Sequence, residues 1–568
     1  MIEDVYEPLG RYRDEFEAKF ASLAREKFAE LTAASGIDVG ANRALAKKIH
    51  RLEAAAGSQR TRKLLFGLLI ALGFVGAALA GCAAAALDTG DVDGACVFAV
   101  ALGIAVGIFA LVLFRRASAR LAELERKIEA GKLTAWEQMA PLNDLYTWDI
   151  PVKLIEATVP RLAYDPYFTV GRLDSLRNRY GWSDAFNDGK SIVFAQSGEI
   201  NGNPFVFGQY LEMTWGEKTY VGTKTISWTE WETDADGKRR RVTRHETLHA
   251  QVTKPIPVYT ESKVLVYGND AAGNLSFSRE PSGLGDATGL WGKFRKYRRL
   301  RELRAFSRNL KDESQFTLMA NEEFETWFHA KDRDDEVEFR LLFTPVAQTQ
   351  MLILMKDRAV GYGDDFTFVK RRKVNLLMSA HLDRAVIDTD PERFRNWDYD
   401  AAKKFFLEFN ERYFKDAYFA LAPLLAIPLY QQTRTHEDIW REALGEPSSF
   451  WEHESIANYY GEELFRHPAC VTRSLLKTRQ VSRGAHGSEI EVTAHGYRSV
   501  DRVDSQSVHG GDGRWHEVDI PWKEYLPVAR SRILRLSERA TPSEEFGREA
   551  EAAGSGVCRR SILSYLTD

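Results

Sequence analysis

The chain has 568 residues, a net charge of -4 and an isoelectric point near 6.4, a balance that argues against a dedicated nucleic-acid-binding protein. Aromatic residues make up 12% of it and include 13 Trp, so the composition is not that of a disordered protein. The length leaves room for two or three folded domains, and the four cysteines predict no disulfide framework.

Residues 1–62 predict helices that precede a membrane segment. Arg11 to Ala33 places apolar side chains near helical spacing, and Ala41 to Ala56 predicts a second helix. The start of the chain lacks the basic residues of a signal peptide. We expect this region to lie in the cytosol.

Two apolar stretches within residues 63–114 predict a transmembrane helical hairpin. Leu64 to Leu87 runs for 24 residues without a charge, and Ala95 to Phe114 adds 20 more. A helix rises about 1.5 Å per residue, so each stretch is long enough to cross a hydrocarbon core of about 30 Å. The polar segment between them, Asp88 to Gly94, predicts a tight turn rather than an aspartic-protease or calcium-binding loop.

The charges on either side of the hairpin predict its orientation. The turn is acidic and carries no Lys or Arg. The flanks are basic, with Arg51, Arg60, Arg62 and Lys63 before the first helix and Arg115, Arg116 and Arg120 after the second. Because basic flanks stay on the cytoplasmic side, we expect both termini in the cytoplasm and the protein in the cytoplasmic (inner) membrane.

Small residues predict close contact between the two spanning helices. The second helix has the motif Gly103-x-x-x-Gly107, and the first offers Gly73, Gly76, Ala77 and Ala80. Glycine and alanine let helix backbones approach closely in a membrane. We expect packing within the hairpin, with dimerisation as the alternative.

Residues 115–190 predict a helical stalk and linker, after which the pattern changes to the two-residue period of strands. Residues 191–310 are the predicted β-rich region, where segments rich in Val, Ile, Thr, Tyr and Trp are separated by Gly and Asp. Asp236-Gly237 is a strong hairpin signal within it. The sequence therefore predicts an antiparallel sheet.

One motif in this region is shared with zinc peptidases. His245-Glu246-Thr247-Leu248-His249 fits H-E-x-x-H, which needs both histidines on one helical face. The surroundings favour a strand, because Leu248, Ala250 and Val252 alternate after the predicted hairpin turn. In a strand these histidines lie about 13 Å apart, too far to share one zinc ion. We predict no catalytic residue, metal or cofactor, and keep a membrane-tethered zinc peptidase as an alternative.

The β-rich region ends in a basic segment, Lys293 to Arg308, with eight Lys or Arg and one Glu. Its apolar residues recur at steps of three, which predicts a basic amphipathic helix. Such a helix packs its apolar stripe into the core, lies on an anionic lipid surface or contacts nucleic acid. In the lipid alternative the residues that contact headgroups are Lys293, Arg295, Lys296, Arg298, Arg299 and Arg301.

Residues 311–445 predict an α+β domain. Its stretch Asn321 to Pro345 reads NEEFETWFHAKDRDDEVEFRLLFTP. Phe324 and Phe328 lie one helical turn apart, and after a charged turn Val337 to Phe343 alternates like a strand. Thr344 then caps a helix, and a hairpin follows.

This stretch resembles a bacterial family of uncharacterised membrane proteins, known as a domain of unknown function. Members have two adjacent transmembrane helices before a cytosolic α+β region. The resemblance implies that arrangement for this chain. It implies no activity, cofactor or catalytic residue.

The last third of the chain predicts a helical end and a small sheet. A helix capped by Asp400 runs into Ala417 to Tyr430, an apolar segment too short to cross a membrane and therefore expected in the core. Residues 446–530 predict a small β-containing region, and residues 531–568 a flexible tail.

Together these patterns predict an α+β protein with a two-helix transmembrane hairpin and a large cytosolic region of antiparallel sheet and helices. No nucleophile elbow, phosphate loop or dinucleotide fingerprint is present in the sequence. The first hypothesis is a membrane-anchored scaffold or binding protein without enzymatic activity, whose partners are the bilayer and an unidentified protein but not nucleic acid. The zinc peptidase and a sensor of anionic lipid surfaces are the alternatives.

Overall fold

The computed structural model describes residues 6–86, 94–233, 239–285, 289–308, 317–431, 446–484, 487–538, 548, 552–554 and 556–567. These residues form a mixed α+β protein with antiparallel sheets and two long apolar helices, which confirms the predicted fold class. The chain divides into two compact units. One holds Met1–Phe20, Trp148–Thr389 and Arg412–Asp568, and the other holds Ala21–Thr147 and Asp390–Glu411.

The second of these units is helical. It contains most of α2 (Glu17–Ser35), all of α3 (Val39–Ala86) and α4 (Gly94–Asn143), and the first part of α12 (Tyr399–Leu425). The Phe406 ring lies 5.3 Å from Phe28 and 6.0 Å from Tyr146. The Asp398 side chain accepts a hydrogen bond from the Asp400 N–H at 2.9 Å, so Asp398 caps α12 in place of the predicted Asp400.

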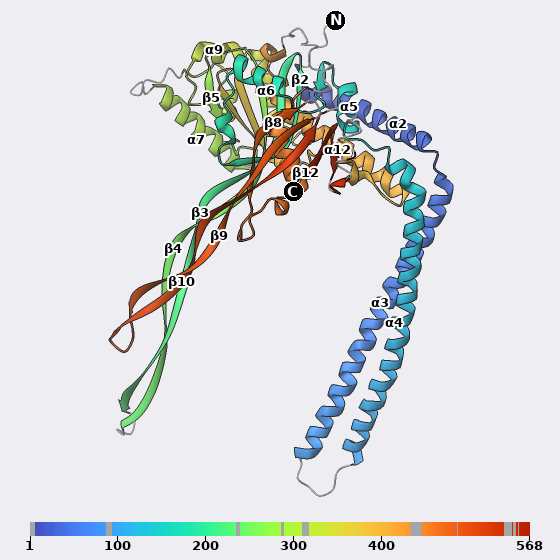
Figure 1. The fold of residues 1–568 in the computed structure, drawn as a ribbon. Coiled ribbons are helices and arrows are strands. Elements are labelled where there is room, and N and C mark those ends of the chain that lie inside the picture. The colour runs from blue at the N-terminus through green and yellow to red at the C-terminus, as the bar shows by residue number, and fades with distance from the viewer. Residues whose placement is uncertain are drawn as a thin grey trace. The chain divides into compact units, whose positions relative to one another are not determined.

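Helices α3 and α4 form the predicted hairpin and are each long and apolar enough to cross a membrane (Figure 1). Each is one unbroken helix that joins a predicted spanning segment to a helix predicted outside the membrane. Leu64, Phe98 and Phe109 are 75%, 69% and 67% exposed, so apolar side chains cover the outer surface of the hairpin. Of the predicted turn, only Gly94 belongs to the described residues, and it begins α4.

Small residues bring α3 and α4 together, which confirms the predicted packing within the hairpin. A Cβ atom on Gly73 would lie 2.9 Å from the Gly103 carbonyl oxygen and 3.0 Å from the Gly107 nitrogen. A Cβ atom on Gly103 would lie 3.0 Å from that of Ala77. Gly76 faces away, because a Cβ atom there would meet nothing within 4 Å.

We predict that Gly73→Leu destabilises the helical hairpin by about 1–3 kcal/mol, because the new side chain must push the α4 backbone away. The matched variant Gly76→Leu points into open space and should leave the stability unchanged. Thermal aggregation of the full chain in detergent measures both. Equal melting temperatures for the two variants would contradict the packing.

The first unit is built on two antiparallel sheets. The larger sheet has the strand order β1-β2-β3-β4-β7-β6-β5. Its strands are β1 (Leu162–Tyr164), β2 (Lys190–Ile200), β3 (Asn203–Thr233), β4 (Arg239–Gly268), β5 (Ser276–Arg279), β6 (Phe366–Arg371) and β7 (Val374–Ser379). Ile192, Val206 and Val264 lie in its buried core.

Several helices accompany this sheet, and one of them forms where the sequence predicted a strand. They are α1 (Pro8–Arg11), α5 (Ile150–Thr158), α6 (Val170–Ser175), α7 (Gly289–Arg308), α8 (Glu322–Phe328), α9 (Glu336–Leu342), α10 (Pro345–Lys356), α11 (Ala380–Arg384) and α13 (Phe450–Tyr460). The predicted strand over Val337 to Phe343 is wrong, because α9 covers Val337 to Leu342 and Phe343 follows it directly. Phe339, Leu342 and Phe343 are buried at helical spacing, whereas Val337 is 78% exposed.

The other elements predicted in this region are present. Helix α8 contains Phe324 and Phe328, and Thr344 caps α10 by accepting a hydrogen bond from the Ala347 N–H at 3.4 Å. Strands β6 and β7 form the predicted hairpin. The apolar segment Ala417 to Tyr430 is buried except for the half-buried Pro428 and Leu429, which confirms that it belongs to the core.

The smaller sheet has the strand order β11-β12-β10-β9-β8. Part of it is formed by residues that the sequence predicted as a flexible tail. Its strands are β8 (Leu475–Gly484), β9 (Gly487–His509), β10 (Trp515–Ser537), β11 (Val557–Arg559) and β12 (Ile562–Thr567). Residues 531–568 are therefore not simply a flexible tail. Strand β12 pairs with the end of β10, and Ile562 and Leu566 pack into the core of this sheet. Most of Thr541 to Gly556 lies outside the described residues.

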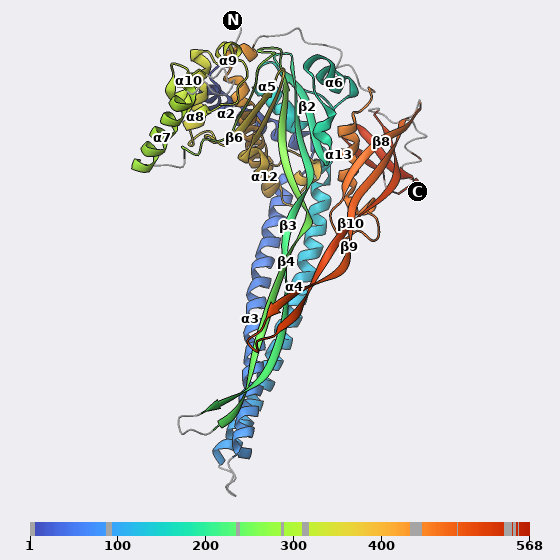
Figure 2. The ribbon, with the colours of Figure 1, turned by 90° about the vertical axis from the view of Figure 1, so that its left-hand side faces the viewer.

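Two long ribbons extend from the sheets. The first ribbon is Met213–Thr233 of β3 with Arg239–Val264 of β4, beyond the residues that pair with β2 and β7. The second ribbon is Gly496–His509 of β9 with Trp515–Arg532 of β10. Figure 1 shows both ribbons leaving their sheets, and Figure 2 shows the second crossing beside the first.

Helix α13 packs against both sheets. Trp451 at its start lies in the core of the larger sheet, and Ile456 lies in the core of the smaller one. A Cβ atom on Gly208 of β3 would lie 2.8 Å from the Trp451 ring, so the indole is pressed against the strand backbone. The helix therefore joins the two cores.

Candidate functional site

The H-E-x-x-H motif lies in strand β4, as predicted. His245 pairs with Ser227 and His249 with Thr223 across the ladder. Four strand residues separate the histidines by about 13 Å, which does not suit a shared zinc ion. Among the residues that the structure describes, no group of three or more His, Cys, Asp or Glu is arranged to hold a metal ion.

Glu246 of this motif makes a structural contact. Its Oε2 atom accepts a hydrogen bond from the Gly511 N–H at 2.6 Å, and Gly511 lies in the turn of the second ribbon. The carboxylate is thereby held between the two ribbons. This position gives it a role in ribbon packing rather than in activating water.

An Asp-His-Ser grouping, in which His381 and Ser379 are buried, supports helix α11. The His381 Nδ1 atom lies 2.7 Å from Asp365 Oδ2, and its Nε2 atom lies 3.4 Å from Ser379 Oγ. Ser379 also accepts the capping hydrogen bond from the Leu382 N–H at 3.3 Å. The adjoining cavity measures about 10 Å³, room for one water molecule at most. The grouping has no space for a substrate.

The predicted basic helix is present as α7, and one face of it packs onto the protein. Lys296 forms an ion pair with Glu323, and Arg304 pairs with Glu322 at 2.7 Å. Arg299 donates a hydrogen bond to the Ser282 carbonyl at 2.7 Å, and burial lowers the pKa of its guanidinium. The predicted contact residues Lys296 and Arg299 are therefore engaged by the protein itself.

The other face of α7 is exposed. Arg295, Arg298 and Arg301 are exposed there, and no ion pair of these three is found within the described chain. Phe294 and Tyr297 lie among them and are 57% and 64% exposed. The predicted apolar stripe is thus divided, because Leu303 further along is fully buried. The Lys293 side chain lies outside the described residues.

The two ribbons pack against each other through a small apolar core. Ile226, Leu248 and Ala250 of the first ribbon meet Val518 and Ile520 of the second. Polar contacts flank this core: Lys224 donates to the Glu517 carbonyl at 2.9 Å, and Lys254 pairs with Asp504 at 2.7 Å. The crossing is therefore a specific contact between the ribbons.

A glycine permits this close approach. A Cβ atom on Gly222 would lie 2.2 Å from the Asp519 carbonyl oxygen. Real Cβ atoms do not approach carbonyl oxygens so closely, so no larger residue fits without separation of the ribbons.

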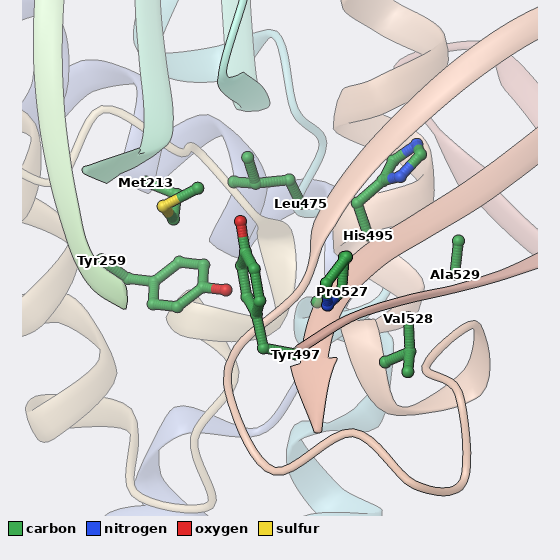
Figure 3. Close-up of a pocket in the computed structure, with 9 residues that line it drawn as sticks. Met213, Tyr259, Leu475, His495, Tyr497, Pro527, Val528 and Ala529 are labelled. Atoms are coloured by element: carbon green, nitrogen blue, oxygen red, sulfur yellow. The ribbon is translucent and has the colours of Figure 1, made fainter. Parts of the chain in front are cut away.

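A cleft opens near the base of the two ribbons (Figure 3). Its volume is about 260 Å³. The lining residues are Met213, Tyr259, Leu475, His495, Gly496, Tyr497, Pro527, Val528 and Ala529. Figure 3 shows the rings of Tyr259 and Tyr497 on the side of Met213, with His495 on the opposite side. The Trp215 ring extends this wall, 5.2 Å from the Tyr497 ring, and is 53% exposed.

The ionisable groups of the cleft are neutral near pH 7. Burial raises the pKa of Tyr259 to about 12, and its hydroxyl lies 3.2 Å from Thr472 Oγ1. Burial, and to a lesser extent the charge of Lys477, lowers the pKa of His495. The cleft therefore offers aromatic and apolar surface with a few neutral hydrogen-bonding groups, which suits an apolar side chain better than an ion.

Strand β3 presents an open edge beside this cleft. It pairs with β4 without a register shift, so alternate residues point their N–H and C=O groups away from β4. Pro255 and Pro257 on β4 have no N–H, and the Met213 N–H on β3 bonds outward to the Gly189 carbonyl at 3.2 Å. The odd-numbered residues are therefore the outward-facing ones. In the described chain no strand pairs with this edge beyond Met213.

One edge of each ribbon carries prolines, whereas the β3 edge and the β9 edge from Gly496 to His509 carry none. Pro255 and Pro257 remove two outward N–H groups from the β4 edge, and Pro521 and Pro527 occupy matching positions on β10. Proline on an edge strand prevents the addition of another strand. The β3 edge from Trp215 to Trp231 contains no proline.

The cleft and the open edge were not predicted from the sequence. Met213 and Tyr497 are far apart in the chain, and only the crossing of the ribbons brings their surroundings together. The prolines in the segments that form β4 and β10 could have indicated edge strands, because proline inside a sheet is found at its edges.

Comparison of the chain with family models, with curated proteins and with solved structures finds no match in any of the three. The function is therefore inferred from the residues of this chain and their geometry.

We predict that Gly222→Ala loosens the ribbon crossing at a cost of about 1–3 kcal/mol, because the added methyl group collides with the Asp519 carbonyl. Thr223→Ala, at the exposed neighbouring position, should have no such effect. Amide hydrogen exchange of both ribbons measures the change. Equal exchange in the two variants would show that the crossing does not depend on Gly222.

Proposed function

We propose that this protein is a membrane-anchored binding protein without enzymatic activity, and that its paired ribbons bind an extended segment of a partner protein. The supporting observation is the proline-free edge of β3 beside the aromatic cleft. An extended peptide can add to such an edge through main-chain hydrogen bonds, while a neighbouring pocket selects its side chains. Tyr259 and Tyr497 line that pocket, and the Trp215 ring lies beside Tyr497.

We further propose that α3 and α4 cross the cytoplasmic membrane as a hairpin with both chain ends in the cytoplasm. The acidic turn and the basic flanks support this orientation. The ribbons would then bind a cytosolic partner. Membership of the bacterial membrane family that Asn321 to Pro345 resembles is part of the same proposal.

The zinc-peptidase alternative receives less support. The strand conformation separates His245 from His249, and Glu246 is engaged by the turn of the second ribbon. Neither arrangement favours a zinc-bound water.

We predict that a fluorescent protein that matures only in the cytosol will fluoresce when fused to either terminus, since both ends are proposed to be cytoplasmic. The same reporter inserted into the turn between Asp88 and Gly94 is the control and should stay dark. Whole-cell fluorescence at equal expression measures this. Darkness at both termini would contradict the proposed orientation.

We predict that the full chain, held in nanodiscs, enriches extended peptides with alternating apolar residues from a displayed library of random peptides. Thr219→Pro should abolish this binding, because the Thr219 N–H points outward from β3 and its loss leaves the ladder with β4 intact. Thr253→Pro is the matched control. Thr253 is the cross-strand partner of Thr219, their hydroxyls lie 3.0 Å apart, and its N–H points to the edge already blocked by proline.

A second pair of measurements tests the cleft. Tyr497→Ala should weaken binding of the enriched peptides by at least tenfold, because aromatic anchors in a pocket dominate such interfaces. Failure to enrich any peptide, or equal binding by the Thr219→Pro and Thr253→Pro variants, would contradict the proposed function.

A further inference from the structure

The exposed face of helix α7 is positively charged, whereas the cleft near the ribbons is lined by neutral groups. Three arginines, Arg295, Arg298 and Arg301, recur at steps of three, so they lie along one side of the helix. Phe294 and Tyr297 are exposed beside them. The surface therefore combines fixed positive charge with large apolar side chains.

The opposite face of α7 is held by the protein. Leu303 is fully buried, Lys296 pairs with Glu323, and Arg299 donates a hydrogen bond to the Ser282 carbonyl at 2.7 Å. Glu302, one turn after Arg298 on the arginine side, pairs with Lys331 at 2.5 Å. These contacts fix the rotation of the helix about its axis. The arginines and the two aromatic rings are thus kept outward rather than exposed by chance rotation.

Surfaces of this composition fit the interface of an anionic bilayer. Arginine guanidinium groups pair with lipid phosphates, and exposed Phe and Tyr rings enter the boundary between headgroups and acyl chains. The charge of the helix is complementary to anionic headgroups, because Lys293 to Arg308 holds eight basic residues and one acidic residue. Two helices of the same chain are long and apolar enough to cross a membrane, and if they do so the protein is attached to a bilayer.

We propose that the outer face of α7 docks on anionic phospholipid headgroups of a bilayer, with Arg295, Arg298 and Arg301 on the phosphates and with Phe294 and Tyr297 inserted between them. This assigns a lipid-binding surface in addition to the peptide-binding ribbons. It takes three of the six predicted contact residues and omits Lys296 and Arg299, which are engaged by Glu323 and the Ser282 carbonyl.

The test uses the full chain in nanodiscs of neutral phosphatidylcholine, so that α7 is free to bind added vesicles. Sucrose-loaded vesicles of phosphatidylcholine mixed with phosphatidylglycerol are sedimented, and the bound nanodisc fraction is measured. The triple variant Arg295→Gln, Arg298→Gln, Arg301→Gln should bind roughly a hundredfold more weakly, since each basic residue near an anionic surface contributes about a fivefold factor. Vesicles of pure phosphatidylcholine should not bind.

Two further variants distinguish an effect of the α7 surface from an effect of the net charge of the protein. Arg239→Gln, Arg240→Gln, Arg241→Gln removes the same charge from exposed positions on β4 and should leave vesicle binding unchanged. Phe294→Ser with Tyr297→Ser keeps all charges and should weaken binding about tenfold by removing inserted apolar surface. Equal melting temperatures of all variants establish that the fold is kept.

Several outcomes would overturn the proposal. They are absence of vesicle binding by the unaltered chain, unchanged binding by the α7 triple variant, and equal losses in the α7 and β4 variants. A labelled single-stranded RNA that binds the unaltered nanodiscs, when anionic vesicles do not, would assign the arginine face to nucleic acid instead. None of these results bears on peptide binding by the ribbons, because Thr219 and Tyr497 are untouched.

Discussion

The burial of charged groups around helix α13 is the constraint on which the arrangement of the two sheets depends. Glu452 pairs with Arg560, which also donates to the Gln196 side chain of β2 at 2.6 Å. Arg559 donates to the Ser455 carbonyl at 2.7 Å. A buried ion left without its partner costs about 3–5 kcal/mol, so these contacts must all form together. The short C-terminal strands, the helix and the larger sheet therefore fold as one cooperative structure.

Fixing the two sheets relative to each other also determines where the ribbons cross. A two-stranded ribbon is only marginally stable alone, because each face is exposed to water. The ribbons stabilise one another by burying Ile226, Leu248 and Ile520 at the crossing, and Gly222 allows the backbones to approach. The cleft near their base exists only because that geometry holds Tyr259 and Tyr497 on facing strands.

Sequence patterns predicted the helices and strands that have a strong local pattern. They failed where contacts between residues far apart in the chain determine the secondary structure or the pairing of a strand. The apolar runs around Gly73 and Gly103 and the alternation around His245 were sufficient, because a long uncharged apolar run and the two-residue period of a half-buried strand are both visible in the local sequence. The segment Val337 to Phe343 was predicted as a strand because its apolar residues fit a period of two. They also fit one face of a helix, and only the burial of Phe339 and Phe343 distinguishes the two conformations. Strand β12 is six residues long, and its pairing with β10 carries no signal in its own sequence.

The positions of proline explain why the edges of a ribbon can have different roles. An exposed two-stranded ribbon has two unpaired edges, and each is a template for unwanted association. In the first ribbon Pro255 and Pro257 close the β4 edge, while the β3 edge from Trp215 onward is left open beside an aromatic cleft. An edge left open next to a pocket of neutral, apolar character is the arrangement expected when strand addition is the function.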